Sequence, residues 1–439
     1  MMDYIPVFMF IGLFALIFIG LPVAFSLVIV AVGAALLVFG DLAFLQLYGA
    51  VLSTSSNFIL AAIPLFVFMG AVLERTGIAL RLFQSLQLWV GGLPGGLAIA
   101  TVLMCATFAA ASGVVGAVEI VVGLMAIPAM QKYKYDGGLI AGTICAGGSL
   151  GTIIPPSIVV VIYASIAQLS IGQLFAATML PGLLMVVFFL AYIIVRAILK
   201  PSDAPSVDRS EIDKPLAVKL TMSFKAMVPP LLLIFAVLGS LLTGAASPTE
   251  AAAVGAIGAL ILAALFNELS FKNLIAALQV TIRVTAMIML IIVGGTMFTS
   301  LFAVSGGGDL VKDLVTYFGF EKTGLIIFFL AIVFVAGFVL DWISIVLICI
   351  PIFTPFIKAA GIDPIWFAIM VMVVIQTSYL TPPMAPSIFY LRSIAPKSIT
   401  YKHMYRGVIP FVIMQLLVLA VVAIWPATAT YLPSILVGL

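Results

Sequence analysis

Charge is scarce in this chain. Only 8% of its 439 residues are Asp, Glu, Lys or Arg, whereas 64% are hydrophobic. One soluble core could not bury so much apolar surface, so the composition excludes a soluble globular protein. Apolar windows of about 20 residues, enough to cross roughly 30 Å of hydrocarbon, recur from Tyr4 to Pro433. The sequence therefore predicts an all-α polytopic protein whose partner is the lipid bilayer.

Histidine and cysteine are also rare. The single histidine, His403, lies in a basic loop, where a surface role is its simplest interpretation. The three cysteines fall in apolar segments at unrelated spacings, which indicates packing rather than disulfides or metal ligation. HExxH, GxSxG and GxxxxGK[ST] motifs are absent. We therefore predict no cofactor, no enzymatic activity and no ATP hydrolysis by this chain. The formal net charge of +3 is small, and no nucleic-acid partner is predicted.

Two segments interrupt the apolar pattern with Gly, Pro and hydroxyl residues. They are GGSLGTIIPPS (Gly147 to Ser157) and SYLTPPMAPS (Ser378 to Ser387). Proline removes a backbone donor and clashes with the preceding turn, so each Pro-Pro pair predicts a helix broken at membrane depth. Non-helical backbone is tolerated there only around a buried cavity. Such breaks are typical of the binding site of a transporter.

An internal repeat relates the two interruptions. Adding 227 to a residue number in the first half superimposes four landmarks on the second half. The matched pairs are Pro128 with Pro355, Pro155 with Pro382, Pro156 with Pro383, and Tyr163 with Tyr390. A shift shared by four landmarks predicts two structural repeats.

The repeats and the apolar windows give a threading of the chain. The first repeat is expected at 1–200, a cytoplasmic linker at 201–225 and the second repeat at 226–439. Re-entrant hairpins are expected at 94–130 and 323–358, broken helices at 137–168 and 363–391, and surface arms near 77–90 and 308–319. Further spans are expected near 4–20, 22–40, 57–75, 172–199, 226–243, 248–266, 284–304 and 407–426.

Positive charge orients this threading. Of the 19 Lys and Arg residues, all but Lys312, Lys322 and Lys358 fall on one side, which the positive-inside rule makes the cytoplasm. Both termini are then periplasmic, and equivalent features of the two halves cross the membrane in opposite directions. Inverted repeats of this kind are typical of secondary transporters with a site at the midplane between the repeats.

Oxygen-bearing residues gather at the hairpin tips and helix breaks. The tips contain Ser112 and Gly113 in the first repeat, and Gly337 to Ser344 in the second. The breaks add Ser149, Gly151, Thr152, Ser157, Thr377, Ser378, Thr381 and Ser387. Hydroxyls and freed carbonyls suit sodium, and the opposite half-helix ends attract anions without a formal positive charge. Sodium sites and a binding site for an organic anion are therefore expected here, although any one hydroxyl could equally be structural.

Three carboxylates have different expected roles. Asp341 lies in a membrane segment, where an ionisable group is costly and by default functional, so it is predicted to couple ion or substrate. Glu119 lies on the returning arm of the first hairpin and fits a site role and a structural role equally. Glu250 lies beside Pro248 at an expected helix start and is predicted to cap that helix.

Four segments resemble one family along essentially the whole chain. They are the two interruptions, the second extended to SYLTPPMAPSIFYLR, together with AIPLFVFMGAVLERTG (Ala62 to Gly77) and SPTEAAAVGA (Ser247 to Ala256). In this order they resemble the large membrane subunit of tripartite ATP-independent periplasmic (TRAP) transporters. The resemblance implies an elevator-type, sodium-coupled transporter of the bacterial inner membrane. It also implies two separate partners: a small four-helix membrane subunit and a periplasmic substrate-binding protein.

The resemblance also implies a distribution of site residues. The family's sodium sites match Ser112, Gly113, Ser149, Gly151, Gly337, Asp341, Thr381 and Met384. Substrate is expected at Thr152, Ser157, Ser344, Ser378 and Ser387. Many relatives carry Gly soon after the Pro-Pro pair of the second interruption, whereas this chain has Met384, Ala385 and Pro386 there.

The function indicated is sodium-coupled import of a small organic anion, a carboxylate or sulfonate, with a monoanion favoured. A stand-alone sodium and organic anion symporter would share the same motifs without needing partners. An intramembrane enzyme is a more distant alternative, because the expected catalytic motifs are missing. An ion channel would need a selectivity filter or a pore-lining ring, for which the sequence has no cue.

Overall fold

The computed structural model describes residues 4–112, 115–383 and 385–438, and every regular element in these ranges is helical. Up to residue 199 the elements are α1 (Ile5–Ile19), α2 (Val23–Phe39), η2 (Gly40–Leu42), α3 (Ala43–Ser55), η3 (Phe58–Ala61), α4 (Ala62–Glu74), α5 (Ile78–Val90), α6 (Gly96–Ser112), α7 (Val115–Lys132), α8 (Gly137–Ser149), η4 (Leu150–Thr152), α9 (Ile158–Ala167) and α10 (Ile171–Leu199).

The remaining elements follow a short polar segment. They are η5 (Pro201–Asp203), α11 (Arg209–Ile212), α12 (Leu216–Leu242), α13 (Pro248–Leu265), α14 (Phe271–Val304), α15 (Gly307–Phe318), α16 (Lys322–Ala336), α17 (Trp342–Ala359), α18 (Pro364–Leu380), α19 (Pro386–Ile394), α20 (Tyr401–Ile424), α21 (Ala427–Pro433) and η6 (Ser434–Gly438). The predicted all-α class is confirmed.

Within the described residues, seven helical stretches are long and apolar enough to cross a membrane. They are Val23–Ser55, α10, α12, α13, α14, α17 and α20. An eighth would be the pair Phe58–Glu74 and Ile78–Val90, which bends by 61° at a short break. Large apolar side chains such as Phe18, Phe224 and Phe271 are exposed on the surface, as a protein solvated by lipid requires. The chain is a multi-pass membrane protein.

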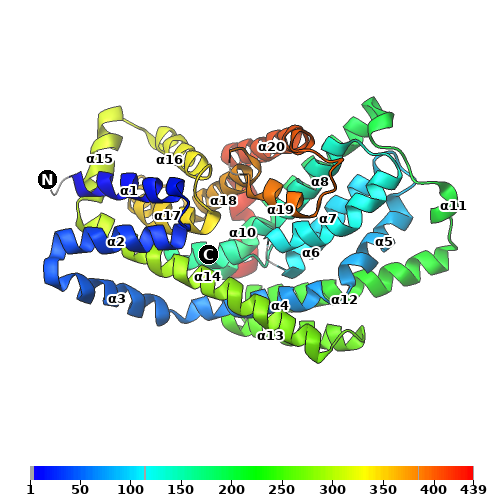
Figure 1. The fold of residues 1–439 in the computed structure, drawn as a ribbon, viewed down its shortest axis with the longest axis horizontal. Helices are drawn as coiled ribbons and strands as arrows, with labels where there is room; N and C mark the ends of the chain where they lie inside the picture. The colour runs from blue at the N-terminus through cyan, green and yellow to red at the C-terminus, as the bar shows by residue number, and fades with distance from the viewer. Residues whose placement is uncertain (1–3, 113–114, 384, 439) are drawn as a thin grey trace.

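Two groups of helices lie side by side (Figure 1). One group, the long-helix layer, consists of α2, α3, α4, α12, α13 and α14. In this layer α14 packs against α2, α3 and α4, and α13 packs against α4 and α12. The other group, the hairpin group, consists of α6 to α10 and α16 to α20. Figure 1 shows the long-helix layer along the lower edge of the view and the hairpin group above it. The groups meet where α14 packs against α17 and where α4 packs against α6.

The expected hairpins and breaks coincide with pairs of helices. The segment 94–130 holds α6 and α7, and 323–358 holds α16 and α17. The first broken helix consists of α8 and α9, and the second consists of α18 and α19. The Pro155–Pro156 and Pro382–Pro383 peptide bonds in these breaks are cis. The arms correspond to α5 and α15. The division of the chain into two repeats and a linker remains a prediction.

Four helix positions differ from the threading. Helix α3 occupies residues for which no helix was expected, and α21 follows the last expected span. Helix α12 begins at Leu216, inside the expected linker, and α14 begins at Phe271 rather than near 284. The early starts have one physical cause: hydropathy marks the hydrocarbon layer, whereas a helix continues past it with charged side chains such as Lys219, which is half-buried, and Lys272, which is exposed.

Side-chain caps fix several helix starts. Asp136 accepts a hydrogen bond from the Leu139 N–H at the start of α8, and Asp363 caps α18 in the same way. Ser247 and Glu250 form a reciprocal capping box at the start of α13. The predicted capping role of Glu250 is thus confirmed.

Glycines allow the central helices to approach closely. A Cβ placed on Gly142 of α8 would lie 2.1 Å from the carbonyl oxygen of Gly407 in α20. On α14, Gly294 faces the Ala24 carbonyl of α2, while a Cβ on Gly295 would lie 2.7 Å from Leu347 of α17. The Gly294–Gly295 pair therefore lets one long helix contact the layer on one side and a hairpin on the other.

The linker crosses the base of the first hairpin. The Gly95 N–H donates to the Ala204 carbonyl at 2.9 Å, and the Val207 N–H donates to the Gly91 carbonyl at 2.8 Å. Arg196 of α10 forms ion pairs with Asp203 of the linker and with Asp136. These bonds hold the entrance to hairpin α6–α7 against the start of the first broken helix.

Candidate functional site

At the first break, the hydroxyl side chains donate hydrogen bonds to nearby backbone carbonyls. Ser149 Oγ donates to the Ala146 carbonyl, Thr152 Oγ1 donates to the Ser149 carbonyl, and Ser157 Oγ donates to the Thr152 carbonyl, each at 2.8 Å. These three side chains and Gly151 are buried. The broken turn between α8 and α9 is thus a compact cluster of hydroxyl and carbonyl oxygens, the type of ligand that sodium prefers.

Ser149 also joins the two halves of the chain. Its Oγ accepts hydrogen bonds from Gln376 Nε2 of α18 at 3.1 Å and from Gln415 Nε2 of α20 at 3.2 Å. Gln376 stands 227 positions after Ser149, the same shift that superimposes the repeats. The bond therefore joins two residues that the predicted repeat makes equivalent. Both glutamine side chains are completely buried, and among the described residues their Oε1 atoms have no hydrogen-bond partner.

The second hairpin packs against the end of α18. A Cβ on Gly337 would lie 2.2 Å from Ser378 Oγ, so only glycine fits at this position of the hairpin. Ser378 Oγ donates to the Ile375 carbonyl at 2.9 Å, and Thr381 Oγ1 donates to the Thr377 carbonyl at 2.8 Å. The predicted residues Gly337, Ser378 and Thr381 therefore lie at one place, where α18 ends.

The first hairpin reaches the second break through Glu119. Ser387 Oγ, at the start of α19, donates to Glu119 Oε1 at 2.7 Å. Glu119 is completely buried, and within the described part of the chain its Oε2 has no partner. A Cβ on Gly148 would collide with the Glu119 side chain, so this carboxyl lies directly against the first break as well. Glu119 therefore touches both breaks.

Asp341 forms the N-cap of α17. Its Oδ2 accepts hydrogen bonds from the N–H groups of Ile343 at 3.1 Å and Ser344 at 3.4 Å, and its Oδ1 accepts from Ser344 Oγ. The predicted substrate residue Ser344 is thus turned toward Asp341 in this structure.

Three predicted sodium residues cannot be placed in this way. Gly113 and Met384 lie outside the described residues. Ser112 ends α6, and its side chain is not described. For the others, the structure brings the first break together with α18, the second break with the first hairpin, and the second hairpin with the end of α18. The described atoms include no direct bond from Asp341 to either break.

Gln376, Gln415 and the contact of Glu119 with the second break were missed by sequence reasoning. A single amide has no spacing motif, and Gln415 lies in an otherwise apolar span. Gln376 carried one usable signal, because the repeat shift places it opposite Ser149. We call the hydrogen-bonded cluster at the two breaks the polar centre; it comprises Ser149, Thr152, Ser157, Ser387, Glu119, Gln376 and Gln415. Three of its buried oxygens, one each from Glu119, Gln376 and Gln415, have no hydrogen-bond partner among the described residues.

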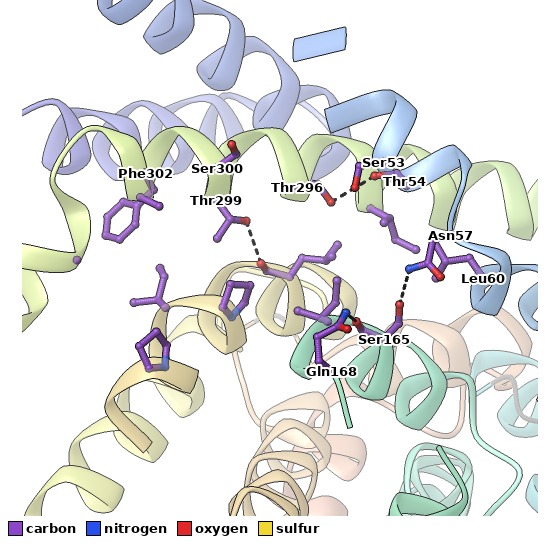
Figure 2. Close-up of a pocket in the computed structure, with 18 of the residues that line it drawn as sticks. Ser53, Thr54, Asn57, Leu60, Ser165, Gln168, Thr296, Thr299, Ser300 and Phe302 are labelled. Atoms are coloured by element: carbon purple, nitrogen blue, oxygen red, sulfur yellow. Dashed lines mark hydrogen bonds between the residues drawn. The ribbon is translucent and has the colours of Figure 1, made fainter. Parts of the chain in front are cut away.

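A cavity of about 650 Å³ lies elsewhere, between the long-helix layer and the hairpin group. Figure 2 shows side chains from α3, α9 and α14 directed into it. None of the predicted site residues that the structure describes lines this cavity. The polar centre and the cavity are therefore separate features. Among the described residues, no cluster of three His, Cys, Asp or Glu side chains could hold a metal ion.

A family model described as the tripartite ATP-independent periplasmic transporter, DctM component, matches residues 10–428. The chain belongs to this family. The C4-dicarboxylate TRAP transporter large permease protein of Pseudomonas aeruginosa is 33% identical over 87% of each chain. The 2,3-diketo-L-gulonate permease of Escherichia coli is 30% identical over 93% of this chain and 94% of its own. The sialic acid permease of Vibrio cholerae is 29% identical over 97% and 98%.

This DctM-family chain also shares its fold with a solved transporter structure. The Alcanivorax borkumensis YdaH transporter matches with a TM-score of 0.62 and 17% identity, over 90% of this chain and 91% of that chain. The relatives are named permeases, so the intramembrane enzyme is no longer an alternative. The chain is a multi-pass inner-membrane permease of the DctM family, and the polar centre is its candidate site.

Proposed function

We propose that this permease imports a small organic anion by sodium-coupled symport. The observation that carries the proposal is the polar centre, in which the two breaks meet the first hairpin, α18 and α20 inside a membrane protein of the DctM family. Buried hydroxyls, carbonyls and carboxylates at membrane depth are costly unless they are functional. A transporter that carries ions and anions through the hydrocarbon needs such a centre.

Sodium is the proposed coupling ion because the centre is rich in oxygen. The described candidate ligands are Ser149, Gly151, Gly337, Asp341 and Thr381, with the glycines acting through their carbonyls. Ser112, Gly113 and Met384 complete the proposed set. Most of the described oxygens are neutral, which suits a monovalent cation that must be released in each cycle. Asp341 supplies a negative charge close to the hairpin end of α17.

The anion is proposed to bind beside the sodium ions. Thr152, Ser157, Ser344, Ser378 and Ser387 supply hydroxyls there. The half-helices α9 and α19 both begin directly after a break, so their N-terminal N–H groups face the centre. Their dipoles can stabilise a carboxylate or sulfonate without a lysine or arginine. The relatives' names include C4-dicarboxylates, sialic acid and 2,3-diketo-L-gulonate, all organic acids.

Transport is proposed to occur by movement of the hairpin group against the long-helix layer, an elevator-type cycle between two inverted repeats. In the membrane, Lys312, Lys322 and Lys358 face the periplasm, together with both termini. Substrate is delivered by a separate periplasmic binding protein, and a small four-helix membrane subunit completes the complex.

A monoanion carried with two sodium ions moves one net positive charge inward. The membrane potential then contributes about 2.3 kcal/mol per 100 mV to each cycle. Import is therefore expected to be electrogenic, and a negative interior potential should accelerate it. Sodium-dependent uptake that ignores imposed voltage would contradict this stoichiometry.

The test is uptake of labelled organic anions by proteoliposomes that hold this chain, the small subunit and the binding protein. Uptake should require an inward sodium gradient and both partners. Replacing sodium by choline should abolish it. Uptake by the chain alone would indicate the stand-alone symporter instead, and uptake without sodium would contradict sodium coupling.

A further inference from the structure

The cavity between the two helix groups has walls that belong to different parts of the fold. Its lining comes from α3 and α14 of the long-helix layer, from α9 and α17 of the hairpin group, and from α15. Its volume of about 650 Å³ lies within the range of roughly 300–1,000 Å³ that is usual for small-molecule sites. The volume therefore accommodates a small organic molecule.

The polar lining is almost entirely uncharged. The neutral polar residues are Ser53, Thr54, Asn57, Ser165, Gln168, Thr296, Thr299 and Ser300. Lys312 is the only charged residue of the lining within the described part of the chain. The acidic neighbours of Lys312 on α15, Asp309 and Asp313, line a separate groove. The cavity thus combines one cation with many hydroxyl and amide groups.

Some of these groups hold the walls together. Asn57 Nδ2 donates to Ser165 Oγ at 2.9 Å, which joins the end of α3 to α9. Thr299 Oγ1 donates to the Leu347 carbonyl at 3.1 Å, which joins α14 to α17. Both bonds are drawn in Figure 2. The walls are therefore held in place before any molecule binds.

Other groups remain available to a ligand. Among the described residues, none hydrogen bonds to Ser53 Oγ, and none pairs with the Lys312 ammonium group. Figure 2 shows Ser53, Thr54 and Thr296 gathered on one side of the cavity. Thr54 and Thr296 share only a long contact of 3.5 Å between their Oγ1 atoms. These hydroxyls can exchange that contact for hydrogen bonds to a ligand.

We propose that this cavity binds a small monocarboxylate that carries several hydroxyl groups, as a second site distinct from the polar centre. Lys312 pairs with the single carboxylate, and the neutral side chains hydrogen bond to the hydroxyls. A dicarboxylate would leave its second charge without a cation in a largely apolar cavity, which is costly. A neutral polyol would leave Lys312 unpaired. The inference rests on the proposed function, because it names the substrate class that this transporter takes up.

Binding of three probes to the purified full chain in nanodiscs tests the proposal. The probes are gluconate, succinate and sorbitol, measured by isothermal titration. Gluconate should bind at least about tenfold more tightly than the other two. Lys312→Gln should weaken gluconate binding about tenfold, as expected for the loss of one charge-assisted hydrogen bond. The matched control is Lys322→Gln, because Lys322 begins α16 outside the cavity lining. It should bind gluconate like the wild type.

A second variant keeps the test independent of charge. Thr296→Phe fills the cavity from α14. It should abolish gluconate binding measured in sodium-free buffer, where the polar centre, proposed to take the anion beside sodium ions, does not contribute. Gluconate binding that survives both Lys312→Gln and Thr296→Phe, or succinate binding as tight as gluconate binding, would overturn the proposal.

Uptake by complete proteoliposomes distinguishes failure of the second-site proposal from failure of the proposed function. A wild-type complex that never shows sodium-driven anion uptake contradicts the function itself. Sodium-driven uptake with an unchanged KM in Lys312→Gln contradicts only the second site.

Discussion

Asp341 has one role that the structure shows and a second role that is proposed. As the N-cap of α17 it accepts hydrogen bonds from two backbone N–H groups, so it stabilises the hairpin. As a half-buried carboxylate in a membrane segment, it is also proposed to offer a charge to a cation. Asparagine can perform the first role but not the second, because it caps helices about as well as aspartate and carries no charge.

Asp341→Asn should therefore keep the fold and weaken the sodium response. The concentration of sodium that gives half-maximal uptake should rise about tenfold or more, while the unfolding temperature in detergent stays close to that of the wild type. Asp341→Ala should lower both sodium response and stability, because it also removes the cap. A wild-type sodium response in Asp341→Asn would rule out the coupling role.

Ser149 is expected to stabilise the polar centre. Ser149→Ala removes the acceptor of two buried glutamine N–H groups. Leaving buried donors unpaired should cost about 2 kcal/mol of stability, measured by thermal unfolding in detergent. Thr143→Val on the same helix is the matched control, since the Thr143 hydroxyl has no partner among the described residues. Equal losses in both variants would show that the Ser149 bonds do not stabilise the centre.

The residues of the site were predictable only in part. Hydroxyls and glycines beside the Pro-Pro pairs follow from the chemistry of a broken helix, and the structure buries Ser149, Thr152 and Ser157 at the first break. Gln415 could not be found in this way, because it lies in a different span and its role depends on tertiary packing. The sequence favoured neither a site role nor a structural role for Glu119. Its bond to Ser387 shows that it joins the first hairpin to the second break.

At the scale of helices, the sequence predicted interruptions better than continuous segments. Proline pairs and small-residue tips located the breaks and hairpins, because these residues act directly on the backbone. Helix α3 was missed because Gln46, Ser53 and Thr54 make its hydropathy uneven, yet its Ala43, Leu47 and Ala50 face is buried against other helices. A short amphipathic helix becomes recognisable only once its packing partner is known.

Close packing between α8 and α20 gives a prediction for a whole element. Gly142→Ala would push a methyl group into the Gly407 carbonyl, so the helices must separate. Overpacking of this kind should cost about 1–3 kcal/mol of stability, seen as a lower unfolding temperature. Gly33→Ala on α2 is the control, because nothing lies within 4 Å of its added Cβ. A Gly142→Ala protein as stable as the Gly33→Ala protein would contradict the packing.

At the scale of the molecule, the account requires the hairpin group to move against the long-helix layer. The bond from Asn57 to Ser165 joins the end of α3 to α9 across this boundary. It must break in each cycle if α9 moves and α3 does not. The bond from Gln131 to Ser398 joins α7 to the loop before α20, inside the hairpin group, and need not break.

Two cysteine pairs distinguish moving from fixed contacts. Cys105, Cys145 and Cys349 are first replaced, and all three are buried. Oxidising the pair Asn57→Cys with Ser165→Cys should stop uptake, and reduction should restore it. Oxidising Gln131→Cys with Ser398→Cys should leave uptake unchanged. Full uptake by the oxidised first pair would show that these elements do not separate.

The most direct test of sodium-coupled symport is simultaneous measurement of sodium and anion influx in the same proteoliposomes, with the complete complex and radioactive sodium. The account predicts that the two fluxes start together, that more sodium than anion enters, and that leaving out either solute stops the influx of the other. Anion accumulation at an unchanged rate in choline medium, with no accompanying sodium influx, would contradict it.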